Sequence, residues 1–123
     1  MTTAQLHFEI QGPDGRQALT FEGFGPHWIG RDPSCDVALA SNNVSRRHAS
    51  IELVAEGIQV RDTSSNGSMV NDILLKRAAR VICSESVTLS VGHFVIRVWR
   101  NGASAPDGSH RDDLSRRIGR ITP

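Results

Sequence analysis

The segment VTLSVGHFVIRV, residues 87–98, decides the fold class of this chain. Apolar and polar residues alternate over 87–91, a turn signal follows at Gly92, and the alternation resumes over 94–98. A period of two is typical of antiparallel strands that bury one face against a core. The segment therefore predicts two adjacent strands joined by a tight turn.

The same alternation recurs through the earlier part of the chain, over 6–11, 19–22, 49–53 and 58–61. Turn signals separate these runs at Gly12 to Gly15, Pro33-Ser34, Asn42-Asn43, Glu56-Gly57, Asn66-Gly67 and Asn71-Asp72. No segment before residue 100 carries the apolar stripe of an amphipathic helix. Short alternating strands at regular spacing predict an all-β, antiparallel sandwich.

The chain divides by composition near residue 100. With 123 residues it is long enough for one domain with its own core, which we place at 4–100. Residues 101–123 begin with a Gly-, Ser- and Pro-rich stretch and continue as a charged segment, a composition that predicts a flexible linker or tail. The tail is also compatible with a connection to another module, which would make this domain the regulatory N-terminal part of a larger protein.

Charge and cysteine content narrow the function classes. The chain has 14 Lys and Arg against 13 Asp and Glu, a net charge of +1, which argues against general binding to nucleic acid or to a membrane surface. No apolar run approaches the roughly 18 residues of a membrane span, and the N-terminus lacks the order of a secretory signal. Cys35 and Cys83 each stand alone, which favours a reducing compartment and hence the cytoplasm.

Three short segments between the predicted strands carry the candidate site: Gly30-Arg31, Ser45-Arg46-Arg47-His48 and Ser65-Asn66-Gly67-Ser68. Arginine presents a rigid fork of donors that suits phosphate oxygens, and hydroxyls and loop amides can fill the remaining acceptor positions. Each segment alone is a weak signal, since Asn-Gly between strands is also a common hairpin turn. Their joint order and spacing favour a phosphate-binding site.

The order Gly-Arg, then Ser-x-x-His, then Asn-Gly resembles the forkhead-associated (FHA) family of phosphothreonine-binding domains, over roughly residues 4–100. The resemblance implies a SMAD-like β-sandwich of about eleven short strands with its ligand loops at one end. It also implies a phosphothreonine-dependent protein–protein interaction module rather than an enzyme.

The resemblance also implies a role for each site residue. The phosphate contacts would be Arg31, the hydroxyl and backbone N–H of Ser45, Arg46 and Ser65. Asn66 would hold the peptide backbone, and Asn43 would influence preference for the residue three positions after the phosphothreonine. Gly30, His48, Gly67 and Asn71 would support the loops.

Three positions depart from the family pattern. Ser68 stands where the family usually has threonine, Asn71-Asp72 replaces Asn-Gly, and residues 83–86 lack the usual Gly-Asp turn. None of the three is an expected phosphate contact. Asp also tolerates the backbone geometry that such a turn requires.

The implied partner is a phosphothreonine-containing protein or peptide, phosphorylated by a serine/threonine kinase. A phosphorylated Thr2, Thr3 or Thr122 is a possible intramolecular ligand. The alternative is an interaction or assembly domain of the same fold that does not need phosphate.

Catalysis by Ser45 and His48 is disfavoured, because no nucleophile elbow or oxyanion-type loop accompanies the pair. The five histidines share no ligand spacing with the cysteines, and there is no Gly-x-x-x-x-Gly-Lys loop. We therefore expect neither a metal nor a nucleotide cofactor.

Overall fold

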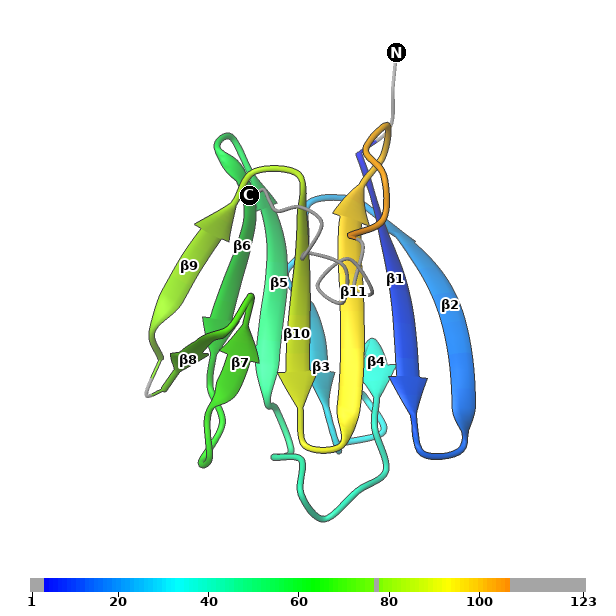
Figure 1. Cartoon of the computed structure of the whole chain (residues 1–123), viewed down its shortest axis with the longest axis vertical. Coiled ribbons are helices and arrows are strands. Elements are labelled where there is room, and N and C mark those ends of the chain that lie inside the picture. The colour runs from blue at the N-terminus through cyan, green and yellow to red at the C-terminus, as the bar shows by residue number, and fades with distance from the viewer. Residues whose placement is uncertain (1–3, 77, 107–123) are drawn as a thin grey trace, which may run out of the picture.

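The computed structural model describes residues 4–76 and 78–106, and over these ranges eleven strands form two packed sheets (Figure 1). The strands are β1 Gln5–Gly12, β2 Gly15–Glu22, β3 His27–Gly30, β4 Val37–Ala38, β5 Ala49–Val54, β6 Gly57–Asp62, β7 Ser68–Val70, β8 Ile73–Leu75, β9 Arg80–Cys83, β10 Ser86–Val91 and β11 Phe94–Arg100. The predicted all-β sandwich is confirmed. The decisive segment forms the β10–β11 hairpin, in which Val91 pairs with Phe94.

One sheet has six strands in the order β2-β1-β11-β10-β7-β8, and the other has five in the order β4-β3-β5-β6-β9. The described pairings are antiparallel except β3 with β4, which run parallel. Edge strands are therefore β2 and β8 in one sheet and β4 and β9 in the other.

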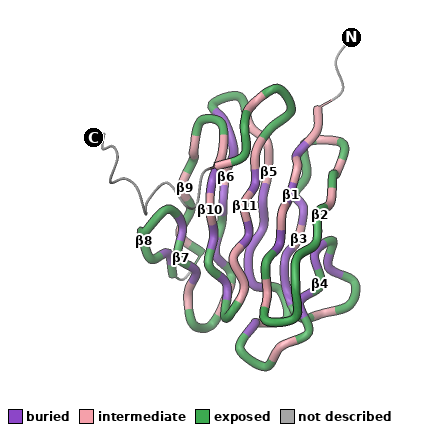
Figure 2. Tube along the Cα trace, turned by 45° about the vertical axis from the view of Figure 1, so that its right-hand side comes forward, coloured by how far each residue is buried: buried purple, intermediate pink, exposed green. Residues whose placement is uncertain are grey.

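The core lies between the two sheets and takes every second residue of the inner strands (Figure 2). Leu6, Phe8 and Ile10 of β1 are buried, whereas the residues between them are partly exposed. Each fully buried apolar side chain contributes about 1.5–3 kcal/mol to stability, so this alternation holds the sandwich together. The register also determines which side chains of each strand face solvent.

The candidate loops lie at one end of the sandwich because of the directions in which β3, β5 and β6 run. Ile29, Ala49 and Asp62 form a single row across β3, β5 and β6. The chain therefore leaves β3, enters β5 and leaves β6 at the same end, which also holds the β1–β2 and β10–β11 turns (Figure 1). Ligand loops at one end were expected from the resemblance.

The β7–β8 turn shows why Asp can replace Gly at position 72. Asn71 and Asp72 adopt φ values of 47° and 73°, as a tight hairpin turn requires. The Asn71 backbone N–H donates to the Thr88 carbonyl at 2.9 Å, and its side-chain oxygen accepts the Thr88 N–H at 3.0 Å. Asn71 thus fastens this turn to β10.

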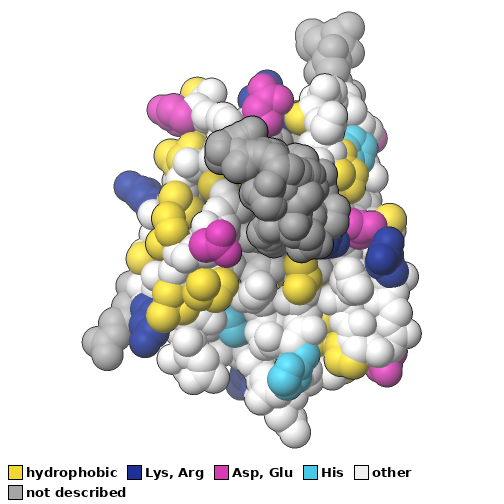
Figure 3. Space-filling view, in the orientation of Figure 1, with side chains coloured by type: hydrophobic (Ala, Val, Ile, Leu, Met, Phe, Trp, Pro, Cys, Tyr) yellow, Lys and Arg dark blue, Asp and Glu magenta, His cyan; other side chains and the backbone are white. Residues whose placement is uncertain are grey.

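Most of the large exposed apolar side chains lie on the side of the molecule formed by β7, β8 and β9 (Figure 3). They are Met69, Ile73, Leu74 and Ile82. Within the described part of the chain, no helix is long and apolar enough to cross a membrane, and no three His, Cys, Asp or Glu side chains are placed to share a metal ion.

The predicted tail and the candidate phosphosites Thr2, Thr3 and Thr122 lie partly or wholly outside the described residues. The division at residue 100 coincides with the end of β11 and stays a prediction.

Candidate functional site

Gly30 lets two of the candidate loops touch. A Cβ atom at this position would collide with the backbone carbonyl of Arg46, so only glycine permits the approach. Next to it, the Arg31 N–H donates to the Ser45 carbonyl at 2.9 Å and the Asp32 N–H to the Arg46 carbonyl at 3.1 Å. These bonds hold Arg31 beside Ser45 and Arg46, as their expected shared role requires.

A depression of about 390 Å³ lies at this junction and is lined by Arg31, Asp32, Pro33 and Arg46. Both arginines are exposed, and among the described residues neither forms an ion pair. Their guanidinium donors are therefore free to bind an anion, and both arginines line the same depression.

Asp32 adds a negative charge to this depression, which the sequence did not lead us to expect. Its carboxylate accepts the Ser34 N–H at 2.9 Å. This bond and the Ser34 hydroxyl, helped by the nearby charges of Arg46 and Arg47, hold the pKa of Asp32 below its usual value. The carboxylate shapes the Arg31 loop and also opposes a bound anion.

His48 joins the second and third loops from a buried position, with 1% of its surface exposed. Its Nδ1 accepts the Ser45 N–H at 3.0 Å, and its Nε2 lies 3.0 Å from the Gly67 carbonyl oxygen. A backbone N–H can only donate and a carbonyl can only accept, so the imidazole must be the neutral tautomer with hydrogen on Nε2. Gly67 has a φ of 94°, a positive value that suits glycine in a tight turn.

The position of Ser45 corrects one expectation. Its backbone N–H, expected to bind phosphate, is used by His48 instead. Its hydroxyl oxygen accepts the Ser65 N–H at 3.1 Å, which leaves the hydroxyl hydrogen to donate to a ligand. Ser45 therefore offers one donor to an anion, and it also ties the second loop to the third.

Asp62 is a supporting residue that the sequence analysis missed. It is fully buried, and its Oδ1 accepts the hydroxyls of Ser64 at 2.6 Å and Ser68 at 2.8 Å. The Ser64 oxygen in turn accepts the Gly67 N–H at 2.7 Å. The network sets the shape of the third loop, and it shows that Ser68 supplies the hydroxyl that threonine would supply.

The remaining predicted residues lie around the same end. Ser65 and Asn66 are exposed on the third loop, and their side chains make no hydrogen bond to the described residues. Asn43 is exposed and lies against the β10–β11 turn, where a Cβ on Gly92 would be 3.4 Å from that of Asn43. Asn71 stands apart, because it supports the β7–β8 turn rather than these loops.

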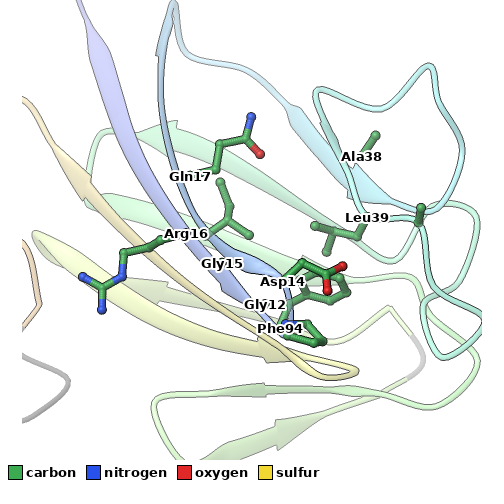
Figure 4. A pocket seen from close by; sticks show the side chains of 11 residues that line it. Gly12, Asp14, Gly15, Arg16, Gln17, Ala38, Leu39 and Phe94 are labelled. Carbon is green, nitrogen blue, oxygen red and sulfur yellow. The ribbon is translucent and has the colours of Figure 1, made fainter.

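A second hollow, of about 320 Å³, lies at the β1–β2 turn between Phe94 and Leu39 (Figure 4). The Phe94 ring lies against Gly12, where a Cβ would come within 2.6 Å of the ring. None of the predicted site residues lines this hollow, so the arginine-lined depression is the better match to phosphate chemistry.

Comparison with known proteins agrees with this geometry. The family model for the FHA domain matches residues 27–93, a span that contains all three loops. A search of curated proteins finds no significant match.

Solved structures share the fold. The FHA domain of the CT664 protein from Chlamydia trachomatis is 18% identical, with 80% of this chain and 97% of that one covered and a TM-score of 0.65. The yeast Dun1 FHA domain, in complex with a doubly phosphorylated peptide derived from Rad53, is 24% identical. The match covers 86% of this chain and 81% of that one, with a TM-score of 0.66. EmbR of Mycobacterium tuberculosis, in complex with a low-affinity phosphopeptide, is 22% identical, with 85% of this chain but 26% of that one covered and a TM-score of 0.65.

Proposed function

The chain belongs to the FHA domain family, a family of interaction modules, and on that premise we propose that it binds a phosphothreonine-containing segment of another protein. The observation that carries the proposal is the depression between the first two loops, where Arg31 and Arg46 form no ion pair with the described residues.

Each expected contact residue of the three loops has a distinct task. Arg31 and Arg46 bind phosphate oxygens with charge-assisted hydrogen bonds, and the Ser45 hydroxyl adds a neutral one. Ser65 reaches the phosphate from the third loop, and Asn66 binds the peptide backbone next to it through an amide that can both donate and accept. Asn43 contacts the side chain that follows the phosphothreonine by three positions.

Phosphorylation switches the interaction on. A phosphothreonine carries about −1.5 to −2 charges at neutral pH, and the unmodified residue carries none. Without that charge the two arginines lose their counterion, so the plain peptide binds weakly. The partner is therefore a substrate of a serine/threonine kinase, and the module acts downstream of that kinase.

The relatives support this proposal without naming a partner for this chain. Two of the similar solved structures hold phosphorylated peptides. The chain matches only about a quarter of EmbR, which agrees with a module that can serve as part of a larger protein.

A second candidate is phosphate-independent assembly through the exposed apolar side chains of Met69, Ile73, Leu74 and Ile82. These residues lie on β7, β8 and β9, away from the arginine-lined depression. Binding by these side chains would not depend on phosphate or on Arg31.

The test is a pull-down of a degenerate peptide library with a fixed phosphothreonine, run beside the same library after phosphatase treatment. The proposal expects sequences enriched only from the phosphorylated library. Equal enrichment from both would contradict it and would favour the phosphate-independent candidate.

A further inference from the structure

An arginine-rich row crosses the outer face of the five-stranded sheet. Trp28, Ser50, Arg61 and Arg80 are direct cross-strand neighbours on β3, β5, β6 and β9. Arg47 lies over Trp28, with its guanidinium carbon 5.0 Å from the ring centroid. We call Arg47, Trp28, Arg61 and Arg80 the basic row.

The row faces solvent because of the strand period. The adjacent row on β3, β5 and β6, which contains Ile29, Ala49 and Asp62, is fully buried between the sheets. Successive residues of a strand point to opposite faces, so the basic row points outward. All three of its arginines are exposed.

The arginines of the row form no ion pair among the described residues, and the carboxylate near Arg47 is that of Asp32. The ion pairs of the described residues, Arg16 with Glu9 and Arg97 with Glu9, both lie on the other sheet. Arg61 and Arg80 stand directly opposite each other, and like charges in that position repel and lower stability. The net charge of the whole chain is only +1, so the row is a local concentration of charge that an anionic partner would relieve.

The row is continuous with the proposed phosphate site. Arg46 lines the depression and Arg47 follows it directly, and the Arg47 carbonyl accepts the Thr63 hydroxyl at 2.7 Å, which fixes the backbone at this junction. The stacked Trp28 ring holds the Arg47 guanidinium over the sheet, where a planar, weakly hydrated cation can meet carboxylates.

The span of the row sets the length of its ligand. Three gaps between neighbouring strands of about 4.8 Å give a row about 14 Å long. An extended chain advances about 3.3 Å per residue, so about four residues cover that distance. Resting on the proposed function, we infer that the partner carries an acidic stretch of about four residues beside its phosphothreonine, and that this stretch lies across the basic row.

The inference is tested with the phosphothreonine sequence selected from the library, synthesised in three forms. One has four Asp residues before the selected sequence, one has four Asp residues after it, and one has four Asn residues at both ends. Affinities are measured by fluorescence anisotropy at low and at high salt. The variants are Arg61→Gln/Arg80→Gln and, as a control with the same charge change, Arg16→Gln/Arg100→Gln.

We expect one of the two Asp-flanked peptides to bind wild-type protein more tightly than the Asn-flanked peptide at low salt. The gain is only roughly fivefold, because exposed ion pairs contribute little free energy and are screened by salt. The advantage disappears in Arg61→Gln/Arg80→Gln, persists in the control variant and fades at high salt. Both variants bind the Asn-flanked peptide as the wild type does, and removing the Arg61–Arg80 repulsion leaves the melting temperature unchanged or raised.

Equal binding of all three peptides, or the same loss in the control variant, would overturn the acidic-stretch inference and leave the proposed function in place. Failure of every phosphopeptide to bind would overturn both.

Discussion

Replacement of His48 by Ala tests whether one buried imidazole holds the ligand loops together. The change removes the acceptor of the Ser45 N–H and the donor to the Gly67 carbonyl, each at 3.0 Å. An unsatisfied buried polar group costs about 1–3 kcal/mol, and both groups lie near the surface, so the lower end applies to each. With the lost packing of a side chain that is 1% exposed, we expect a loss of about 2–4 kcal/mol.

That loss is a large fraction of the total stability of a small domain, about 5–15 kcal/mol. For a domain of this size each kcal/mol shifts the melting temperature by about 4–8 °C, so His48→Ala melts about 10–30 °C below the wild type. Binding of phosphopeptide weakens indirectly, because Ser45 and Gly67 are no longer held in place.

The assay is urea denaturation monitored by tryptophan fluorescence. Peptide titrations are done well below the melting temperature. His48→Leu keeps most of the volume and loses both hydrogen bonds, so it separates the polar contribution from packing. His93→Ala, at an exposed histidine on the β10–β11 turn, is the matched control and should behave as the wild type. A stability of His48→Ala within about 0.5 kcal/mol of the wild type would refute this reasoning.

Four further predictions concern the site and the two cysteines. Matched phosphothreonine and phosphoserine peptides should differ in calorimetry by about 1–3 kcal/mol in favour of threonine, the range for one methyl group in an apolar pocket, and equal affinities would refute that selectivity. Asp32→Asn keeps an acceptor for the Ser34 N–H and removes a charge that repels phosphate. The variant should therefore bind phosphopeptide more tightly at low salt, and weaker binding would show that the carboxylate itself is needed. Burial raises the pKa of the Cys35 and Cys83 thiols, so both should resist alkylation at neutral pH, as mass spectrometry would show. Since the folded thiols hold their protons more tightly than the unfolded ones, stability should fall as the pH rises above the ordinary thiol pKa of about 8.5, and a flat profile there would contradict the assignment.

Much of the fold was predictable because the strands that form the core alternate cleanly. The predicted hairpin over 87–98 and the predicted alternation over 6–11 agree with the β10–β11 pairing and with the burial pattern of β1. The two-residue strand β4 was beyond sequence reasoning, since Val37–Ala38 is too short to show a period and its pairing with β3 depends on tertiary structure.

In the site, residue types were predictable and hydrogen-bond partners were not. The burial of Asp62 follows the period of Ile58 and Val60, so it could have been found, yet a polar residue at a strand end also suits a solvent-exposed turn. The hydrogen bond from the Ser45 N–H to His48 depends on the shape of a loop, and no local sequence pattern predicts that shape. The basic row depends on the register of four strands, which the sequence does not display.

The most direct test of the account is calorimetric titration of one library-selected peptide, in its phosphothreonine and plain threonine forms, into the wild type and Arg31→Ala. We expect the wild type to bind only the phosphorylated form. Loss of one partner of a desolvated charge pair costs about 2–5 kcal/mol, so Arg31→Ala should bind it at least about thirtyfold more weakly while melting at the same temperature. Equal binding of the two peptide forms by the wild type, or full affinity in Arg31→Ala, would contradict the claim that this arginine-lined depression binds phosphothreonine.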